Sequence, residues 1–324
     1  MSLVTATPEN IERAARLLRG GRLVAFPTET VYGLGADAPN GIAVAGLFEA
    51  KGRPQFNPLI VHVPDLGQAG PLGRFNDLAL DLARAFWPGP LTLVVAKAAA
   101  SPIAELATAG LATIALRVPS HPVAQALLRA TGRPLAAPSA NRSGHVSTTE
   151  AQHVEADLGD RVALILDAGA SERGLESTIL DATGEVPVLL RPGAITAEEI
   201  ARATGCTPVL ADALADASRP QAPGQLASHY APRAAVRLNA THVAPGEALL
   251  AFGAGLPPHS GPMLNLSPSG DLREAAARLF SAFRQLDASG APTIAVMPVP
   301  EVGLGAAIND RLRRAAAPRG DAPG

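Results

Sequence analysis

Short apolar runs alternate with segments of helical periodicity along the first 207 residues. A buried strand needs a run of only a few apolar residues, whereas an amphipathic helix repeats them every three or four positions. The runs predict strands at residues 23–26, 59–63, 91–96, 113–118, 135–137, 162–166, 177–181 and 186–190. The stripes predict helices at residues 8–19, 40–50, 77–86, 122–129, 149–158 and 196–203. Thr7 as N-cap, Pro8 in the first turn and Gly20-Gly21 as the stop mark the first helix.

Several of these strands follow one another with no helix between them. A doubly wound parallel sheet needs a helix at each crossover, so this order favours an α/β fold with a large, mixed and twisted sheet. The sequence has no G-x-G-x-x-G after a strand, no G-K-[ST] phosphate loop and no H-E-x-x-H.

The composition changes after residue 207, where Ala, Asp, Pro, Gln and Gly predominate. Residues 208–234 are therefore predicted to link residues 1–207 to a second domain, residues 235–324. In that domain, strands at 248–252 and 293–296 alternate with helices at 272–286 and 306–315. This order predicts a small, open, Rossmann-like α/β domain.

Composition limits the class of protein. The chain has 324 residues, 47% of them hydrophobic, and 27 Lys+Arg balance 29 Asp+Glu for a net charge of −2. That balance argues against a protein that coats nucleic acid. A single cysteine, Cys206, excludes an intramolecular disulfide framework and a Cys-rich metal site. Without a leader pattern or an apolar run of about 18 residues, the chain is expected to be cytoplasmic and not membrane-bound.

Positive charge gathers in the middle of the predicted first domain. Residues 51–149 contain nine cations, Lys51, Arg53, Arg74, Arg84, Lys97, Arg117, Arg129, Arg133 and Arg142, against four anions, Asp65, Asp77, Asp81 and Glu105. A basic patch facing one cleft fits a small ligand that carries phosphate better than it fits a long polyanion.

Polar side chains crowd the ends of two predicted strands between Phe26 and His62. Hydroxyls, Glu29 and two glycines follow the first strand, and a loop with Lys51, Arg53 and two prolines precedes the second. Polar groups at strand ends suit a binding site for a small polar anion. The alternative is that the glycines and prolines only form turns.

An ordered set of motifs runs from this stretch into the linker. The motifs are Pro27-Thr28-Glu29-Thr30-Val31-Tyr32-Gly33-Leu34, Lys51-Gly52-Arg53-Pro54, Asn57-Pro58-Leu59, Trp87-Pro88-Gly89-Pro90-Leu91-Thr92, Arg117-Val118-Pro119, Pro138-Ser139-Ala140-Asn141, Ser143-Gly144, Glu176-Ser177-Thr178-Ile179, Leu190-Arg191-Pro192-Gly193 and Ser228-His229-Tyr230-Ala231-Pro232. Together they resemble the threonylcarbamoyl-AMP synthase family in its two-domain form, with a YrdC-type catalytic domain. The second domain carries little motif signal.

The resemblance implies a nucleotidyltransferase that makes L-threonylcarbamoyl-adenylate and pyrophosphate from L-threonine, bicarbonate and ATP. Other proteins then use the product to modify a tRNA adenosine beside the anticodon, so stable binding of nucleic acid is not expected. The resemblance puts Thr30, His62, Arg117, Ala137 and Ser177 around threonine. It puts Arg53, Asn57, Thr113, Ser139, Ser147, Arg191 and Tyr230 around ATP, with Lys51 and Arg53 as the catalytic cations.

The residue types suit this chemistry, because anionic reactants need fixed cations and Arg117 can bind a carboxylate through two hydrogen bonds. Each residue also has an ordinary interpretation. Arg117 and Arg191 can be strand-end cations, and Asn57, Ser139 and Ser147 can be turn formers. His62 can be a hydrogen-bonded core histidine, and Thr113 a β-former.

The chain offers no carboxylate cage for a metal, so Mg²⁺ is expected to arrive with ATP, with Glu29 as the nearest acid. The sequence of the segment from Ser228 to Pro232 is too specific for a spacer, and we expect this segment to fold over the cleft as a lid.

Two alternative functions remain. One is a double-stranded RNA-binding module of the same fold, which the 3% aromatic content disfavours. The other is a carbamoyl-transfer domain, whose usual Cys-rich flanks are missing.

Overall fold

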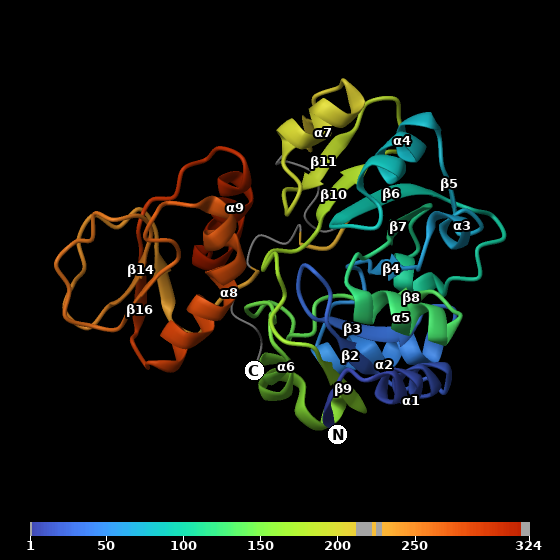
Figure 1. The fold of residues 1–324 in the computed structure, drawn as a ribbon, viewed down its shortest axis with the longest axis horizontal. Helices are drawn as coiled ribbons and strands as arrows, with labels where there is room; N and C mark the ends of the chain where they lie inside the picture. The colour runs from blue at the N-terminus through green and yellow to red at the C-terminus, as the bar shows by residue number, and fades with distance from the viewer. Residues whose placement is uncertain (1, 212–221, 225–228, 319–324) are drawn as a thin grey trace.

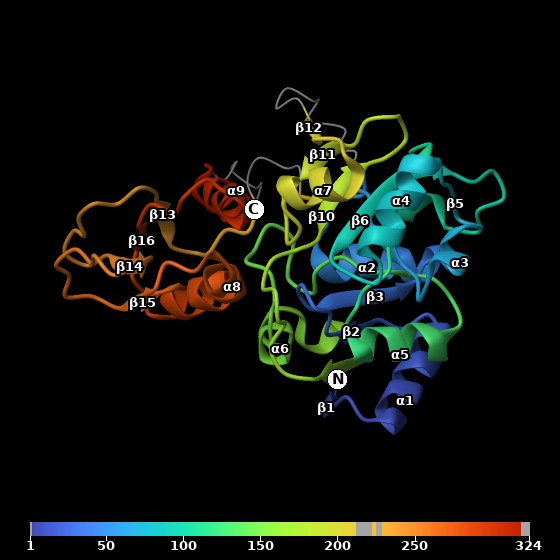
Figure 2. The ribbon, with the colours of Figure 1, turned by 45° about the horizontal axis from the view of Figure 1, so that its top comes forward.

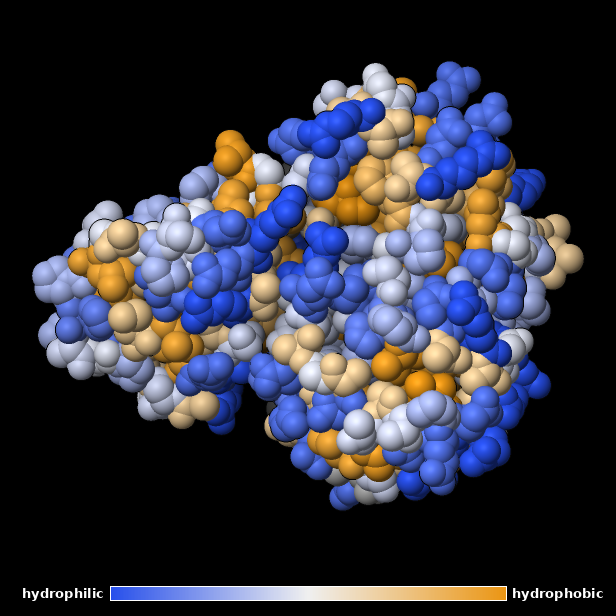
Figure 3. Space-filling model, viewed as in Figure 1, coloured by the Kyte–Doolittle hydropathy of each residue, from blue (hydrophilic) through white to orange (hydrophobic). Residues whose placement is uncertain are grey.

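The computed structural model describes residues 2–211, 222–224 and 229–318. Ser228 and most of the predicted linker lie outside these residues. Figure 1 shows a larger body that includes the helices as far as α7 (Ala197–Thr204), and a smaller body with α8 (Leu272–Ala288) and α9 (Leu304–Ala316). In the space-filling view the outline narrows where the two bodies meet (Figure 3).

The larger body is built on one sheet. Its strands are β1 (Leu3–Thr5), β2 (Val24–Phe26), β3 (Gly33–Asp37), β4 (Ile60–His62), β5 (Gly73–Arg74), β6 (Leu91–Lys97), β7 (Thr113–Arg117), β8 (Leu135–Ala136), β9 (Leu164–Asp167), β10 (Thr178–Asp181), β11 (Val188–Arg191) and β12 (Val209–Leu210). The helices before α7 are α1 (Pro8–Arg19), α2 (Gly41–Lys51), α3 (Leu66–Ala69), α4 (Asp77–Phe86), α5 (Pro122–Thr131) and α6 (Ala151–Leu158).

The strand order is β1-β9-β2-β3-β8-β4-β7-β6-β10-β11-β12, with β5 paired to β6. The neighbours of β4 illustrate the mixture of directions, because β4 runs parallel to β7 and antiparallel to β8. The predicted mixed, twisted α/β sheet is confirmed. Its central strands end beside one another, which brings polar residues from distant parts of the sequence to one edge.

The predicted start of α1 is confirmed, since the Thr7 hydroxyl accepts a hydrogen bond from the Asn10 amide at 3.3 Å. Strand β3, in contrast, was expected to be a loop. Its glycines hide the strand signal, and the packing of Phe26 explains them. A Cβ on Gly35 would lie 3.0 Å from the Phe26 ring, and one on Gly33 3.4 Å from it.

The smaller body has a second sheet in the order β13-β16-β14-β15, formed by β13 (Ala235–Arg237), β14 (Ala248–Ala251), β15 (Met263–Asn265) and β16 (Thr293–Val296). Every pair in it is parallel. The predicted small open α/β domain is therefore observed, although β13 and β15 are not fully buried and lack the apolar run of a buried strand. Helices α8 and α9 lie on the side of this sheet that faces the larger body (Figures 1 and 2).

The two bodies share apolar contacts. The core of the smaller body, which includes Phe280 and Phe283, continues to Val31, Val146 and Leu175 of the larger body. Gly174 lies so close to α8 that a Cβ there would be 2.4 Å from the Ala277 carbonyl oxygen. Within the described residues, no helix has the length and apolar character that a membrane span requires.

Candidate functional site

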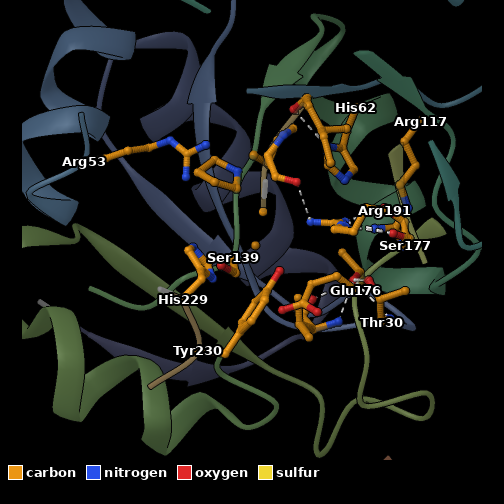
Figure 4. Close-up of a pocket in the computed structure, with 18 residues that line it drawn as sticks. Thr30, Arg53, His62, Arg117, Ser139, Glu176, Ser177, Arg191, His229 and Tyr230 are labelled. Atoms are coloured by element: carbon orange, nitrogen blue, oxygen red, sulfur yellow. Dashed lines mark hydrogen bonds between the residues drawn. The ribbon is translucent and has the colours of Figure 1, made fainter. Parts of the chain in front are cut away.

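A cavity lies at the edge where the central strands of the larger sheet end. The loop after β2, the strands β4 and β7, the loop after β8 and the segment before β10 each contribute to its wall (Figure 4). Linker residues Pro223, Gly224, His229 and Tyr230 form the remaining side. The free space is only about 40 Å³, room for a few water molecules. The linker therefore occupies volume that a nucleotide would need.

Arg117, at the end of β7, is held by a carboxylate. Its Nη2 donates to Oε1 of Glu29 at 2.7 Å, and the backbone amide of Ser120 donates to Oε2 of Glu29 at 3.2 Å. Burial tends to raise the pKa of the Glu29 carboxyl, but the charge and hydrogen bond of Arg117 and the backbone amides bring it below its ordinary value. The buried Nε of Arg117 has no partner among the described residues. The guanidinium is thus oriented on one side and still has a donor to offer.

His62 ends β4 beside Arg117. Burial, reinforced by the charge of Arg117, lowers the pKa of His62 to about 3. The ring is therefore neutral near pH 7. Its Nδ1 lies 3.3 Å from the carbonyl oxygen of Ile60. Because a carbonyl can only accept, we place the proton on Nδ1, which leaves Nε2 as an acceptor.

Arg191, the last residue of β11, crosses to the segment before β10. Its Nη2 donates to the Ser177 carbonyl at 2.8 Å and to the Ser177 hydroxyl at 3.2 Å, and that hydroxyl lies 2.7 Å from the hydroxyl of Thr92. Its Nη1 donates to the carbonyl of Pro223 in the linker at 3.3 Å. Burial lowers the pKa of Arg191. This arginine therefore connects the sheet to the linker.

Lys51 is the last residue of α2, and Arg53 lies in the loop that follows it. Arg53 lines the cavity and donates to the carbonyls of Asn57 and Pro58, at 3.3 and 2.9 Å. Burial lowers its pKa to about 10. The ammonium of Lys51 donates to the carbonyls of Ser139, at 2.6 Å, and Asn141. Lys51 thus holds the loop after β8 from behind, and it does not line the cavity.

Tyr230 is buried in the wall with a left-handed backbone, φ +61°. Its ring stacks on Phe280 of α8, with centroids 5.7 Å apart, and meets the edge of His229 at 4.1 Å. Neither the Tyr230 hydroxyl nor Nδ1 of His229 has a partner among the described residues. A Cβ on Gly224 would lie 2.8 Å from the Tyr230 hydroxyl, so glycine is required there.

The structure brings most of the predicted residues together and leaves others outside. Those that line the cavity are Thr30, Arg53, His62, Arg117, Ala137, Ser139, Ser177, Arg191 and Tyr230. Asn57 and Ser147 are buried behind it, and Thr113 lies at the opposite end of β7 from Arg117. Both amide atoms of Asn57 are buried without a partner in the described part of the chain.

Sequence reasoning gave no role of their own to Thr28 and Glu176, which line the cavity, and it named His229 only as part of the lid segment. Glu176 was visible only as part of a motif, as a carboxylate directly before a buried strand. In the structure its Oε1 accepts from the Ser147 hydroxyl, and its Oε2 accepts from Nε of Arg311 at 2.9 Å. The partner on α9 lies 135 residues away, and no local pattern predicts it.

No metal site is built from side chains in the part of the chain that the structure describes. It contains no group of three or more His, Cys, Asp or Glu side chains arranged as ligands. Glu29 and Glu176 are already engaged by arginines.

Two family models divide the chain. Residues 16–193 match the Sua5/YciO/YrdC model, described as "Telomere recombination". Residues 195–317 match the model described as "Threonylcarbamoyl-AMP synthase, C-terminal domain". Threonylcarbamoyl-AMP synthase of Bacillus subtilis is 41% identical over 334 residues, which cover 98% of this chain and 95% of the relative.

The chain belongs to the threonylcarbamoyl-AMP synthase family. Within the family, a crystal structure of Pyrococcus abyssi Sua5 complexed with L-threonine has a TM-score of 0.90, 37% identity and 98% coverage of both chains. A shorter member, threonylcarbamoyl-AMP synthase of Vibrio vulnificus, is 37% identical over 187 residues. The match uses 98% of that relative but only 57% of this chain.

Proposed function

We propose that this protein is an L-threonylcarbamoyladenylate synthase, a nucleotidyltransferase that forms threonylcarbamoyl-AMP and pyrophosphate from L-threonine, bicarbonate and ATP. The observation that carries the proposal is the convergence of Arg53, Arg117 and Arg191 on one small closed cavity that also holds neutral His62. Three fixed cations suit a site where a carboxylate, bicarbonate and a triphosphate must meet.

The threonine end of the cavity is the one around Arg117. Its guanidinium, held by Glu29, pairs with the substrate carboxylate. Nε2 of His62 accepts a hydrogen bond from the substrate amine. Thr30, Ser177 and the backbone at Ala137 complete this end. The crystal structure of the Pyrococcus abyssi relative is a complex with L-threonine, which supports threonine as a ligand of this protein.

The ATP end is the one around Arg53 and Arg191, which take the phosphates together with Ser139. Lys51 acts from behind by fixing the carbonyls of Ser139 and Asn141. The unpartnered amide of Asn57 and hydroxyl of Tyr230 provide hydrogen-bonding groups for the nucleotide. Ser147 lies behind the cavity and acts indirectly, because its hydroxyl donates a hydrogen bond to the cavity residue Glu176. Thr113 stands apart, and only the family resemblance assigns it to ATP.

The chemistry needs positioning more than a protein base. The threonine amine attacks the carbon of bicarbonate, and an amine proton leaves with a bicarbonate hydroxyl as water, which gives a carbamate. A carbamate oxygen then attacks the α-phosphorus of ATP. The bond to the β-phosphate breaks, and pyrophosphate departs with its electron pair. Alignment and charge neutralisation supply the acceleration in such a step.

Mg²⁺ would be held mainly by the triphosphate, where it would neutralise charge on the departing pyrophosphate.

The linker acts as a lid that excludes water from the adenylate, through Pro223, Gly224, His229 and Tyr230. Because the free volume is about 40 Å³ with these residues in place, they must withdraw to admit ATP. The product then passes to proteins that modify tRNA.

Pyrophosphate release from ATP tests the proposal. It should require both threonine and bicarbonate, and omission of either should reduce it to background. Serine and alanine serve as matched controls for the threonine pocket. ATP turnover that is indifferent to both co-substrates would overturn the proposal.

A further inference from the structure

A continuous chain of polar contacts joins the smaller body to the wall of the cavity. Arg284 of α8 donates from Nε to the Ser147 carbonyl at 3.2 Å, and binds Asp157 through two hydrogen bonds at 3.0 and 2.8 Å. The Ser147 hydroxyl donates to Glu176, and Nε of Arg311 donates to the same carboxylate at 2.9 Å. Two arginines of the smaller body thus bracket the Ser147–Glu176 pair.

Arg311 is the more deeply placed of the two. Its side chain is 0% exposed, and its partner Glu176 is 7% exposed. Its Nη1 donates to the carbonyl of Pro192 at 2.9 Å and to Asp310 at 2.7 Å. Glu176 and Pro192 flank the two strands that present Ser177 and Arg191 to the cavity. The guanidinium therefore ties both strand ends to α9.

The same guanidinium also supports the lid residue Tyr230. Its Cζ lies 5.1 Å from the centre of the Tyr230 ring, within the range of a cation–π contact. Phe280 of α8 stacks on Tyr230 with ring centroids 5.7 Å apart. Next to it, the amide of His229 donates to the carbonyl of Arg314 on α9 at 3.3 Å. Residues of α8 and α9 thus hold the lid segment in the cavity wall.

A buried ion pair often has only a structural role, and apolar residues of similar volume can replace both partners at little cost in stability. Here the arginine contacts Glu176, Pro192 and Tyr230 of the site at once. The Vibrio vulnificus relative aligns with only 57% of this chain although 98% of its own length is used. The family therefore also includes members much shorter than this chain.

We propose that Arg311 is a positioning residue of the site, which couples the smaller body to the strand ends that present Ser177 and Arg191 to the cavity. The proposal rests on the function proposed above. Arg311 orients Glu176, Pro192 and Tyr230 together, so its loss should affect the ATP end of the cavity. The threonine end shares Ser177 with this network but is held mainly by Glu29 and Arg117, so it should change much less.

The test compares Arg311→Met and Arg311→Lys with Arg313→Met in the full-length chain. Arg313 lies on the same helix and forms an exposed pair with Glu301, which makes it a matched control. KM is measured separately for ATP and for threonine. Hydrogen–deuterium exchange, recorded with and without ATP, follows the amides of His229 and Ala231.

Arg311→Met should raise KM for ATP at least tenfold, with KM for threonine unchanged within about twofold, and the two amides should exchange faster. Arg311→Lys should raise KM for ATP by about threefold. Since lysine keeps a positive charge beside Glu176, this variant carries the test if the methionine variant does not fold. Arg313→Met should match the native chain.

An unchanged KM for ATP in both Arg311 variants, or an equal rise in both KM values, would overturn the proposal. So would a fall in kcat and in melting temperature alone, because that is the signature of a structural role. If the native chain shows no threonine-dependent turnover, the proposed function fails. The exchange rates would then decide separately whether Arg311 holds the lid.

Discussion

Arg117 and Glu29 form an ion pair inside the wall of the cavity, with Nη2 and Oε1 2.7 Å apart and side chains only 4% and 6% exposed. The pair orients the guanidinium before any substrate arrives. Its hydrogen bond uses one edge of the guanidinium, and the buried Nε is left without a partner among the described residues. This relationship leads to two predictions.

Arg117→Ala should weaken threonine binding far more than ATP binding. Removing one partner of a buried, charge-assisted pair costs about 2–5 kcal/mol, and in this variant the Glu29 carboxylate is also left uncompensated. Calorimetric titration with each ligand measures the difference. Equal losses for the two ligands would assign Arg117 a structural role.

Glu29→Gln should alter the pH dependence of stability. The folded-state pKa of Glu29 lies below its ordinary value of 4.5. Between the folded-state pKa and about pH 4.5, the unfolded chain therefore binds more protons than the folded chain. The contribution of the pair to stability is complete above about pH 4.5. That contribution is lost as the pH falls through the folded pKa. Urea unfolding between pH 3 and 7 should show a shallower acid loss in the variant, and parallel curves would contradict the assignment.

His62 should stay neutral across the physiological range. Its pKa is lowered from 6.5 to about 3 by burial and by the charge of Arg117. In NMR spectra of histidine-labelled protein, the signal that His62→Gln removes should not titrate between pH 5 and 8. A midpoint near pH 6.5 for that signal would mean that the ring is solvated.

A chain that ends at Thr207 should keep the larger sheet but make little adenylate. The main core clusters of the larger body are formed by its own residues, whereas Val31, Val146 and Leu175 would lose their apolar cover. We therefore expect a folded protein with a lower melting temperature. Tyr230→Ala in the full chain should show a milder defect in the same assay. Full activity of the shortened chain would reduce the linker to a tether.

The pattern of apolar positions predicted most of the fold, because most strands and helices carry local signals. The α1 cap at Thr7 and the span of α4 are examples. Strand β3 escaped because it contains Gly33 and Gly35, which carry no strand signal, and the Phe26 ring leaves little room for a Cβ at position 35. The short strands β12 and β13 escaped because they are exposed or only partly buried, so they lack the buried apolar run that revealed the equally short β4 and β8.

The site was predictable only in part, and for a different reason. Ordered motifs indicated Arg117, Arg191 and Tyr230, which line the cavity together. The partners that orient them come from tertiary contacts over long separations, such as Glu29 for Arg117 and Arg311 for Glu176. Lys51 shows the converse, since its charge suggested contact with substrate while its ammonium binds two carbonyls behind the cavity.

The central claim concerns the product, and mass spectrometry of one reaction tests it most directly. The protein is incubated with ATP, L-threonine and ¹³C-labelled bicarbonate, and the mixture is quenched and separated at once. We predict an adenylate whose mass contains threonine, AMP and the labelled carbon, formed together with an equal amount of pyrophosphate. Pyrophosphate release without this species, or an adenylate that lacks the labelled carbon, would contradict the account.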